Sequence, residues 1–242
     1  MRLIVSPVEA STPEPCELWR FPLDQYLPAA AIATLSPDEI ARARRFVFEK
    51  DRHHFMAARA ALRQLLAQRT GLSPAALAFT AGPFGKPTLA TAPGLHFNLS
   101  HSGATGVLAL SERQHMGIDV ELLRPMPDAI TLANAYFAPA ERSAIAAIDD
   151  TTVRDAAFLR CWTRKEASLK AIGIGLHLAT AGFEVGTGTD ERAVEIATTD
   201  GVERIWLQPL ALGEGLVASL ALRLGQGPSP GRRPASALAS CS

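Results

Sequence analysis

Hydrophobic residues recur at helical spacing over two long parts of the chain, and the first of these lies between residues 36 and 71. It opens with Ser36 as a helix N-cap, Pro37 at the first helical position and Glu39 three residues after the cap. Ser36 and Glu39 form a capping-box pattern, and proline is common at the first helical position. The apolar spacing then continues to Gly71, a residue type that commonly ends helices. This part of the chain therefore predicts one long helix or two consecutive helices.

The second helical part lies in the other half of the chain. One helix is predicted to begin at Pro139, and a longer one covers residues 150–173, where Thr152 and Asp155 have capping-box spacing. Residues of one side of this longer helix predict a buried stripe, which consists of Phe158, Cys161, Trp162, Lys165, Leu169 and Ile172.

Elsewhere hydrophobic and polar residues alternate with the period of a β-strand. Residues 95–110, LHFNLSHSGATGVLAL, predict a strand, a turn and a second strand, and residues 115–123, HMGIDVELL, predict a third. The period of two returns between residues 183 and 224, with a hairpin signal at Asp200-Gly201. Both halves of the chain thus contain helices followed by strands.

This order of elements predicts an α+β fold made of two lobes of similar size, although the two halves show no convincing sequence repeat. We expect an N-terminal lobe over residues 1–108 and a C-terminal lobe over residues 109–225. Residues 226–242 are rich in Gly, Pro and Ser without an apolar period, which predicts a disordered tail.

The composition excludes a wholly disordered protein, because 48% of the 242 residues are hydrophobic and can bury a core. Acidic and basic residues balance at 24 each, so we expect neither a nucleic acid nor a membrane as partner. The three cysteines lie far apart without metal-ligand spacing, which is typical of a reducing compartment. Because the sequence also lacks a signal segment and a membrane span, we expect a cytoplasmic protein.

Positive charge is nevertheless concentrated in the first helical part. Between residues 41 and 63 only Glu49 and Asp51 are acidic, and Arg52, Arg59 and Arg63 recur on one helical face. Two explanations remain open for this basic region: a solvated helix face, or a binding surface for a phosphorylated ligand or an acidic partner.

Two acidic residues stand out in the third predicted strand, GIDVE. Asp119 and Glu121 are two residues apart, so both carboxylates leave the same face of the strand. They indicate either a solvated acidic face or a site for Mg²⁺, a cation that prefers carboxylate oxygens.

The longer C-terminal helix offers a third carboxylate, Glu166, four residues before Lys170. The two could form a surface ion pair worth about 0.3–0.5 kcal/mol. They also flank the buried stripe of this helix, so a place at the edge of a packed interface is the alternative.

Smaller signals surround these acidic residues. Ser100 and His101 lie at the predicted strand end in FNLSHSG, where they form either a plain turn or a phosphate site. Lys86, in GKP, is one of only four lysines against twenty arginines. The sequence contains no glycine-rich phosphate loop, no nucleophile elbow and no zinc-protease motif, which excludes those common enzyme classes.

Taken in order, GKP, FNLSHS, GIDVE and WTRKEASLKAIGIGL resemble the motifs of the Sfp-type 4′-phosphopantetheinyl transferases, in the branch with Ala after the motif glutamate. The resemblance covers most of the chain. It implies a pseudo-dimeric α+β monomer with its active site between the lobes. It also implies coenzyme A and an apo acyl or peptidyl carrier protein as substrates.

The resemblance further assigns roles to residues. Asp119, Glu121 and Glu166 are expected to hold Mg²⁺, or Mn²⁺ in its place. The residues expected to contact coenzyme A are Lys86, Ser100, His101 and Lys170, with Arg45, Arg52 and His54 near its 3′-phosphate. Arg59 and Arg63 are expected to do no more than brace their helix.

For the reaction, we expect Glu166 to take the proton of the carrier serine, directly or through a water, while Lys170 stabilises the departing 3′,5′-ADP. Two other functions remain open: a non-catalytic binder of coenzyme A or carrier protein, and a metal-dependent phosphohydrolase that uses the same carboxylates. The choice among fatty-acid, polyketide and peptide carriers depends on surface contacts rather than on these motifs.

Overall fold

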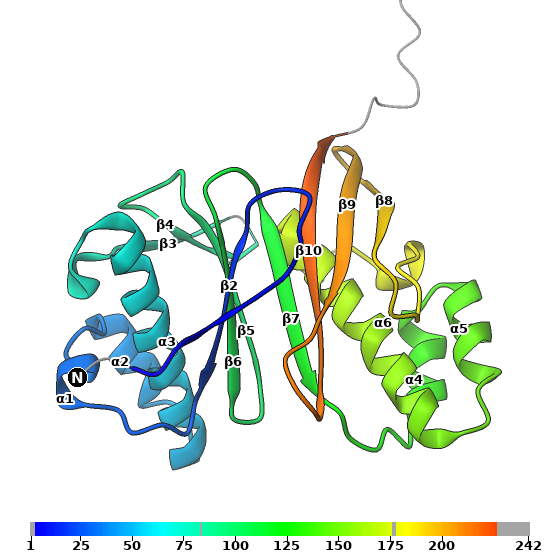
Figure 1. Cartoon of the computed structure of the whole chain (residues 1–242), viewed down its shortest axis with the longest axis horizontal. Coiled ribbons are helices and arrows are strands. Elements are labelled where there is room, and N and C mark those ends of the chain that lie inside the picture. The colour runs from blue at the N-terminus through cyan, green and yellow to red at the C-terminus, as the bar shows by residue number, and fades with distance from the viewer. Residues whose placement is uncertain (1–2, 83, 176–177, 227–242) are drawn as a thin grey trace, which may run out of the picture.

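The computed structural model describes residues 3–82, 84–175 and 178–226, and it consists of two lobes side by side (Figure 1). Each lobe contains a four-stranded antiparallel sheet. The first sheet has the spatial order β1 (Ser6–Val8), β2 (Glu17–Pro22), β6 (Thr105–Ser111) and β5 (His96–Ser102). The second has the order β7 (Met116–Leu122), β10 (Leu216–Gln226), β9 (Gly201–Leu210) and β8 (Arg192–Thr198).

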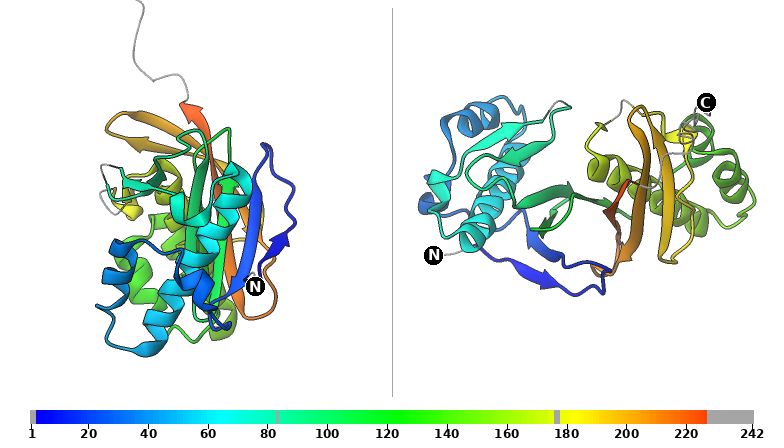
Figure 2. Two further views of the ribbon diagram at one scale, coloured as in Figure 1. Left: turned by 90° about the vertical axis from the view of Figure 1, so that its left-hand side faces the viewer. Right: turned by 90° about the horizontal axis from the view of Figure 1, so that it is seen from above.

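The helices lie on the outer flanks of the two sheets (Figures 1 and 2). Those of the first lobe are α1 (Ala29–Ile32), α2 (Pro37–Ala43) and α3 (Glu49–Thr70), followed by a short turn η1 (Pro74–Ala76) and the small hairpin β3 (Phe79–Ala81) and β4 (Pro87–Leu89). Those of the second are α4 (Ala129–Tyr136), α5 (Pro139–Ala146) and α6 (Thr151–Ile172), followed by η3 (Thr180–Gly182). None of the helices in the described ranges is long and apolar enough to cross a membrane.

Most of the predicted elements are present, with local corrections. The first helical part forms two helices, and the capping box of Ser36 and Glu39 starts the first of them. The N-cap of α6 is Asp150 rather than Thr152, because the Asp150 side chain accepts the Val153 N–H. Asp155 instead accepts the backbone N–H of Met126 at 3.0 Å. The sequence analysis did not predict α1 and α4.

Along the chain, the boundary between the two lobes falls between β6 and β7. The whole of β6 pairs with the first sheet, so the predicted division after residue 108 falls within this strand and the chain passes between the sheets at residues 112–115. The predicted tail lies outside the described residues, apart from Gln226 at the end of β10.

The two sheets pack on one another through an apolar layer. This layer contains residues of both lobes, among them Leu18 and Val107 from the first sheet and Ile118, Val120 and Leu220 from the second. Each lobe also has its own hydrophobic core between sheet and helices. Burial of apolar surface therefore stabilises the contact between the lobes as well as each lobe.

Each lobe contains a buried ion pair that ties its long helix to the rest of the lobe, and we refer to these pairs as the two struts. In the first strut, Glu39 of α2 accepts from Arg63 of α3 at 2.8 Å. In the second, Glu141 of α5 pairs with Lys165 of α6 at 2.7 Å. Arg63 and Lys165 occupy the same position in α3 and α6, which are both 22 residues long.

The struts also make equivalent contacts with the backbone. Arg63 Nη1 donates to the carbonyls of Pro74 and Leu77 at 2.8 and 3.0 Å. Lys165 Nζ donates to those of Thr180 and Phe183 at 2.8 and 2.6 Å. In both lobes the acceptors are the first residue of the following 3₁₀ turn and the residue directly after that turn. The expected bracing role of Arg63 is thus confirmed, and Arg59 pairs with the same Glu39 carboxylate.

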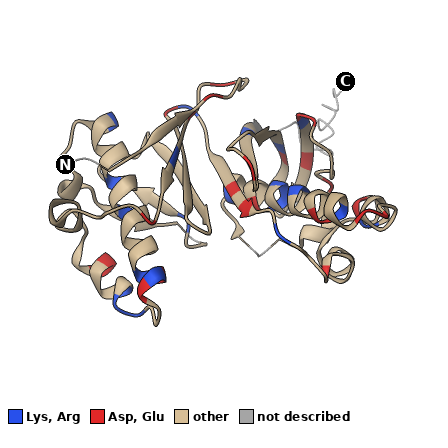
Figure 3. Ribbon diagram, turned by 60° about the horizontal axis from the view of Figure 1, so that its bottom comes forward, with Lys and Arg blue, Asp and Glu red and all other residues tan. Residues whose placement is uncertain are grey.

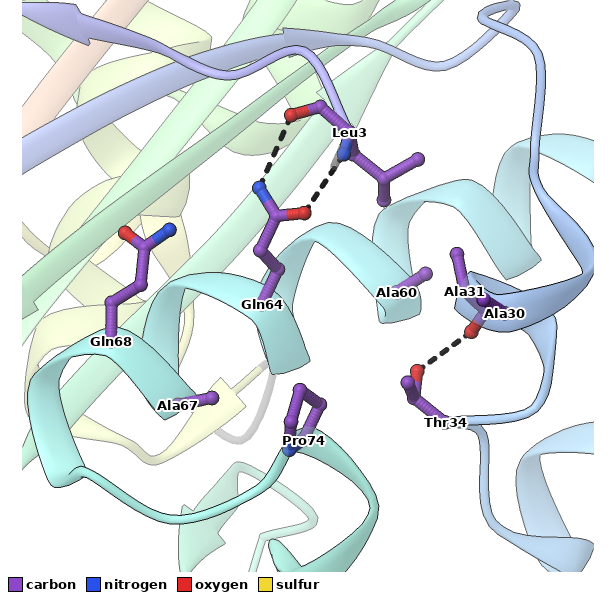
Figure 4. A pocket seen from close by; sticks show the side chains of 9 residues that line it. All are labelled: Leu3, Ala30, Ala31, Thr34, Ala60, Gln64, Ala67, Gln68 and Pro74. Atoms are coloured by element: carbon purple, nitrogen blue, oxygen red, sulfur yellow. Dashed lines mark hydrogen bonds between the residues drawn. The ribbon is translucent and has the colours of Figure 1, made fainter. Parts of the chain in front are cut away.

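The residue after each strut cation differs between the lobes: it is Gln64 in the first and Glu166 in the second. The Gln64 amide binds both backbone groups of Leu3, accepting at 2.8 Å and donating at 3.1 Å, and so fixes the N-terminal segment to α3 (Figure 4). Beside it lies a cavity of about 370 Å³, and the described residues that line it carry no titratable side chain.

Candidate active site

The acidic motif of β7 lies directly against α6 because residue 117 is a glycine. A methyl group at Gly117 would overlap the carbonyl oxygen of Ala167 and lie 2.5 Å from the amide nitrogen of Ala171. Only a residue without a Cβ allows the helix to approach the strand this closely. This approach brings Glu166 and Lys170 of α6 to the face of β7 that carries Asp119, and Figure 3 shows the acidic positions of β7 beside the helix.

Substitution of Gly117 by Ala is expected to force α6 away from β7 and to lower the free energy of unfolding by about 1–3 kcal/mol, the usual cost of overpacking. Urea denaturation measures this change. Gly94→Ala is the matched control, because a methyl group there meets no atom within 4 Å. Equal stability of the two variants would contradict the close approach as the reason for the glycine.

Asp119 is the central residue of the site. It is 6% exposed, and its Oδ1 accepts from Ser100 Oγ at 2.8 Å and from Lys170 Nζ at 2.6 Å. Its other oxygen, Oδ2, is buried without a hydrogen-bond partner among the atoms of the described chain. A buried carboxylate oxygen without a partner is costly, so this atom indicates a place for a bound positive group.

The other two predicted carboxylates lie within electrostatic reach of Asp119. Burial raises the pKa of Glu166, and the charges of Asp119 and Glu121 raise it further, while Lys170 lowers it. Glu121 is half-buried and accepts from Ser102 Oγ at 3.1 Å. Lys170 pairs with Asp119, and Arg124 pairs with Glu121 at 3.3 Å. Two cations therefore face three carboxylates, and the remaining negative charge is a condition that a divalent cation relieves.

The residues present therefore fit a hard cation, although not as a finished site. In the described parts of the chain, no three His, Cys, Asp or Glu side chains are grouped closely enough to hold a metal ion as they stand. The Lys170 ammonium pairs with one oxygen of Asp119. The other oxygen, Oδ2, has no hydrogen-bond partner in the described chain and could bind a metal ion. The Glu166 carboxylate, which lies within electrostatic reach of Asp119, could be a second ligand.

Lys170 connects both sides of the site. Besides Asp119, its ammonium lies 3.2 Å from Ser100 Oγ of the first lobe and 3.3 Å from the Ile118 carbonyl of the second. The side chain remains partly exposed. It can therefore reach a ligand from its present position.

Lys86 comes from the hairpin of the first lobe and crosses to the second. Its ammonium donates to the carbonyl of Met116 in β7 at 2.9 Å. It also donates to the carbonyl of Lys170, in the C-terminal turn of α6, at 2.6 Å. Burial, aided by the charge of Arg223, lowers its pKa to about 8. It also lines a cavity of about 400 Å³ with His96 and His115. In this structure the side chain joins the lobes, and its predicted contact with coenzyme A stays a prediction.

The predicted basic residues lie farther out. His101 is exposed at the end of β5. Burial is the main cause of the lowered pKa of His54 on α3, and the charges of Lys50, His53 and His101 contribute to it. His101 of the first sheet therefore lies within electrostatic reach of His54 on α3. Arg52 pairs with Glu49, while Arg45 is exposed beyond the end of α2.

The sequence analysis missed three residues that position the carboxylates. Gly117 is one of them. Asn98 Oδ1 accepts the Ile118 N–H at 2.7 Å, and the Ser102 hydroxyl accepts the Leu122 N–H at 3.0 Å while it donates to Glu121. Asn98, Ser100 and Ser102 are spaced by two along β5, a polar alternation that could have indicated a strand face directed at GIDVE.

Comparison with known proteins gives consistent similarities. A family model described as the 4′-phosphopantetheinyl transferase superfamily matches residues 115–218, and one described as 4′-phosphopantetheinyl transferase, N-terminal, matches residues 18–113. The chain is 42% identical over 166 residues to the 4′-phosphopantetheinyl transferase HetI of Nostoc sp., which covers 66% of this chain and 69% of HetI.

Two further relatives are more distant. The 4′-phosphopantetheinyl transferase Sfp of Bacillus subtilis is 30% identical over 164 residues, covering 68% of this chain and 71% of Sfp. The human L-aminoadipate-semialdehyde dehydrogenase-phosphopantetheinyl transferase is 30% identical over 182 residues, covering 69% of this chain and 57% of the human protein.

Proposed function

Because the chain belongs to the 4′-phosphopantetheinyl transferase superfamily, we propose that it transfers the 4′-phosphopantetheine arm of coenzyme A to the serine of an apo carrier protein and releases 3′,5′-ADP. The main support from the geometry is Asp119, which lies close to Lys170 and Glu166. Its buried Oδ2 has no hydrogen-bond partner in the described chain. Phosphoryl transfer requires this combination of acidic metal ligands and phosphate-binding cations.

The proposed metal ligands are Asp119, Glu121 and Glu166. Bound there, Mg²⁺ would neutralise negative charge on the coenzyme A pyrophosphate. Two residues of β5 support these ligands: Ser102 orients the Glu121 carboxylate, and Asn98 fixes the backbone of β7. Such supporting hydrogen bonds set the direction in which a carboxylate presents its oxygens.

The proposed phosphate contacts come from both lobes. Lys170 lies between the carboxylates and Ser100, so its ammonium can move from Asp119 to a pyrophosphate oxygen with little displacement. The exposed His101 lies beyond Ser100 on the same strand and can donate to the same group. We propose that Lys86 contacts a phosphate of coenzyme A and that Arg45, Arg52 and His54 lie near the 3′-phosphate, whose charge the two guanidinium groups neutralise.

In the proposed reaction Glu166 accepts the proton of the carrier serine. The serine oxygen forms a bond to the β-phosphorus as the bond to the bridging oxygen breaks, and 3′,5′-ADP leaves with that oxygen. A carboxylate held beside the reacting atoms is a common general base in phosphoryl transfer. Lys170 stabilises the charge that develops on the leaving phosphate.

Both sides of the site come from one chain, so we propose that the protein acts as a monomer. Cys16 and Cys161 are free thiols in the structure, which is compatible with a cytoplasmic location. Membership of the branch with Ala after the motif glutamate stays a prediction.

The reaction is tested by intact mass spectrometry of apo acyl and peptidyl carrier proteins incubated with this protein, coenzyme A and Mg²⁺. We expect a mass gain of one phosphopantetheinyl arm on the carrier, lost when the metal is removed. Free phosphopantetheine without a modified carrier would instead indicate a phosphohydrolase. Coenzyme A binding without either product would indicate a non-catalytic binder.

A further inference from the structure

Where α6 crosses β7 and β10, the contact between helix and sheet is made by small residues. The backbone of α6 at Ala167 and Ala171 faces Gly117 of β7, and Ala221 of β10 belongs to the same hydrophobic core as both alanines. Small side chains interlock little, and the hydrophobic effect that holds them together has no direction. This part of the contact therefore does little to fix the position of α6 along its own axis.

That position decides whether Glu166 and Lys170 meet Asp119. A shift of the helix by one residue displaces its side chains by about 1.5 Å. Lys170 Nζ and Asp119 Oδ1 are 2.6 Å apart, so such a shift would exceed the range over which a hydrogen bond persists. A misplacement of about 1 Å at an active site can cost about 10²-fold in rate. The candidate site therefore requires a contact that fixes α6 along the sheet.

A buried pair of hydroxyl groups supplies such a contact. Thr163 Oγ1 of α6 lies 2.9 Å from Ser219 Oγ of β10, and the two residues are 0% and 1% exposed. Thr163 also donates to the carbonyl of Arg160 at 3.1 Å. Because a hydroxyl group has a single proton to donate, Ser219 is the donor to Thr163. Both hydroxyls are thus paired, and the bond between helix and strand has a defined direction.

The strand register and the helical period place this bond beside the candidate site. Ser219 stands directly opposite Asp119 in the pairing of β10 with β7, so both side chains point to the face of the sheet that α6 covers. Thr163 precedes Glu166 by three residues, which is slightly less than one helical turn. The hydroxyl pair therefore joins α6, within one turn of Glu166, to the residue next to Asp119 in the sheet.

The first lobe offers an internal comparison. Thr163 in α6 and Ala61 in α3 occupy the same position in two helices of 22 residues. Ala61 is fully buried in the apolar core of its lobe. The helix with Gln64 therefore has no hydroxyl at this position, and the helix with Glu166 has one.

We propose that Thr163 and Ser219, which we call the register pair, are positioning residues that set where α6 lies along the second sheet. They act through the helix, because its correct placement brings Glu166 and Lys170 to Asp119. Buried polar contacts can fix the register of packed elements without adding to stability. The proposal rests on the proposed function, which assigns these three residues to one reaction.

The double variant Thr163→Val/Ser219→Ala tests the proposal. It removes both hydroxyls and leaves no buried polar group without its partner, so its urea midpoint should stay close to that of the wild type. We expect kcat for transfer to fall about 10–100-fold, because the reacting groups are misplaced. The KM for the carrier protein should not change, since no surface residue is altered. A purely structural role would instead leave the rate per folded molecule unchanged.

Three single variants control this result. Thr163→Ser keeps the hydroxyl, so its kcat should lie within about twofold of the wild type. Ser168→Ala is the matched control, because Ser168 is also 0% exposed on α6 but donates to the carbonyl of Arg164 in the same helix at 2.8 Å. Its kcat should equal that of the wild type. Ser219→Ala leaves the bond from Thr163 to Arg160 intact and should lower kcat even if the double variant proves too unstable for kinetics.

A kcat that is unchanged in both Ser219→Ala and the double variant, or lowered equally in Ser168→Ala, would overturn the proposal.

A double-mutant cycle gives a readout that needs no catalysis. Urea denaturation of Asp119→Asn, Lys170→Met and their combination measures the coupling between these two side chains, first with the register pair present and then in its double variant. We expect the coupling to fall by at least about half when the pair is removed. Equal coupling in both backgrounds would contradict the proposal. Failure of the wild type to modify any carrier protein would count against the proposed function alone.

Discussion

Glu166→Gln is expected to lower kcat by about 10²–10⁴-fold, the usual contribution of a positioned proton acceptor, while the protein remains as stable as the wild type or becomes slightly more stable. The activity falls because an amide can neither take the serine proton nor supply a charged ligand. Stability is retained because the raised pKa of Glu166 reflects a carboxylate that is disfavoured by burial and by Asp119 and Glu121. Rate measurements by mass spectrometry and urea denaturation of the same preparation check both parts.

The variant also separates the two roles of this residue. Full recovery of the rate at saturating Mg²⁺ would show that Glu166 only binds metal, and the base role would be wrong. Glu195→Gln on the exposed part of β8 is the matched control, and it should change neither rate nor stability. A large loss of stability in Glu166→Gln would contradict the repulsion described among the three carboxylates.

Lys165→Met is expected to lower the free energy of unfolding by about 3–5 kcal/mol, because it leaves the Glu141 carboxylate buried without its cation. Lys165 and Glu141 are 1% and 3% exposed. The Glu141 carboxylate also accepts the N–H groups of Val185 and Gly186 at 2.6 and 3.0 Å. It is therefore fixed where water cannot replace the lost ammonium. Urea denaturation near neutral pH measures the loss.

The pH dependence of this strut has a definite sign. Burial would raise the pKa of Glu141, but Lys165 and the backbone donors outweigh burial and lower it. A lowered folded-state pKa stabilises the protein above the ordinary pKa of a glutamic acid, and the contribution is lost as the pH falls toward the folded value. The difference between wild type and Lys165→Met should therefore shrink in acid.

Two further variants define the origin of the loss. Adding Glu141→Gln to Lys165→Met should restore part of the stability, because no charge then remains buried. Lys50→Met removes an exposed lysine and should change stability by no more than about 0.5 kcal/mol. A loss in Lys165→Met no larger than in Lys50→Met would contradict the strut.

The sequence predicted much of this architecture because its signals are local. The capping box at Ser36 and the alternation around GIDVE depend on neighbours in the chain, and both correspond to observed elements. Asp119, Glu166 and Lys170 were predicted to form one site from the family resemblance, and the structure places them together.

The remaining features depend on contacts between distant residues. Lys165 is read from its helix as part of an apolar stripe, and nothing local identifies Glu141, 24 residues earlier, as its partner. The backbone acceptors of Lys86 lie in the other lobe. Asp150 displaced Thr152 as the cap of α6 because Asp155 is engaged by the chain before α4. Such pairings follow from packing, which periodicity does not encode.

The two struts carry information about ancestry. An ion pair with the same helix positions and the same pair of backbone acceptors in both lobes is what duplication of a half-length chain would leave behind, even after sequence similarity has faded. The residue after the cation is Glu166 in one half and Gln64 in the other, where it fastens the N-terminal segment. The same supporting arrangement thus holds an acid at the candidate site in one half and a purely structural contact in the other.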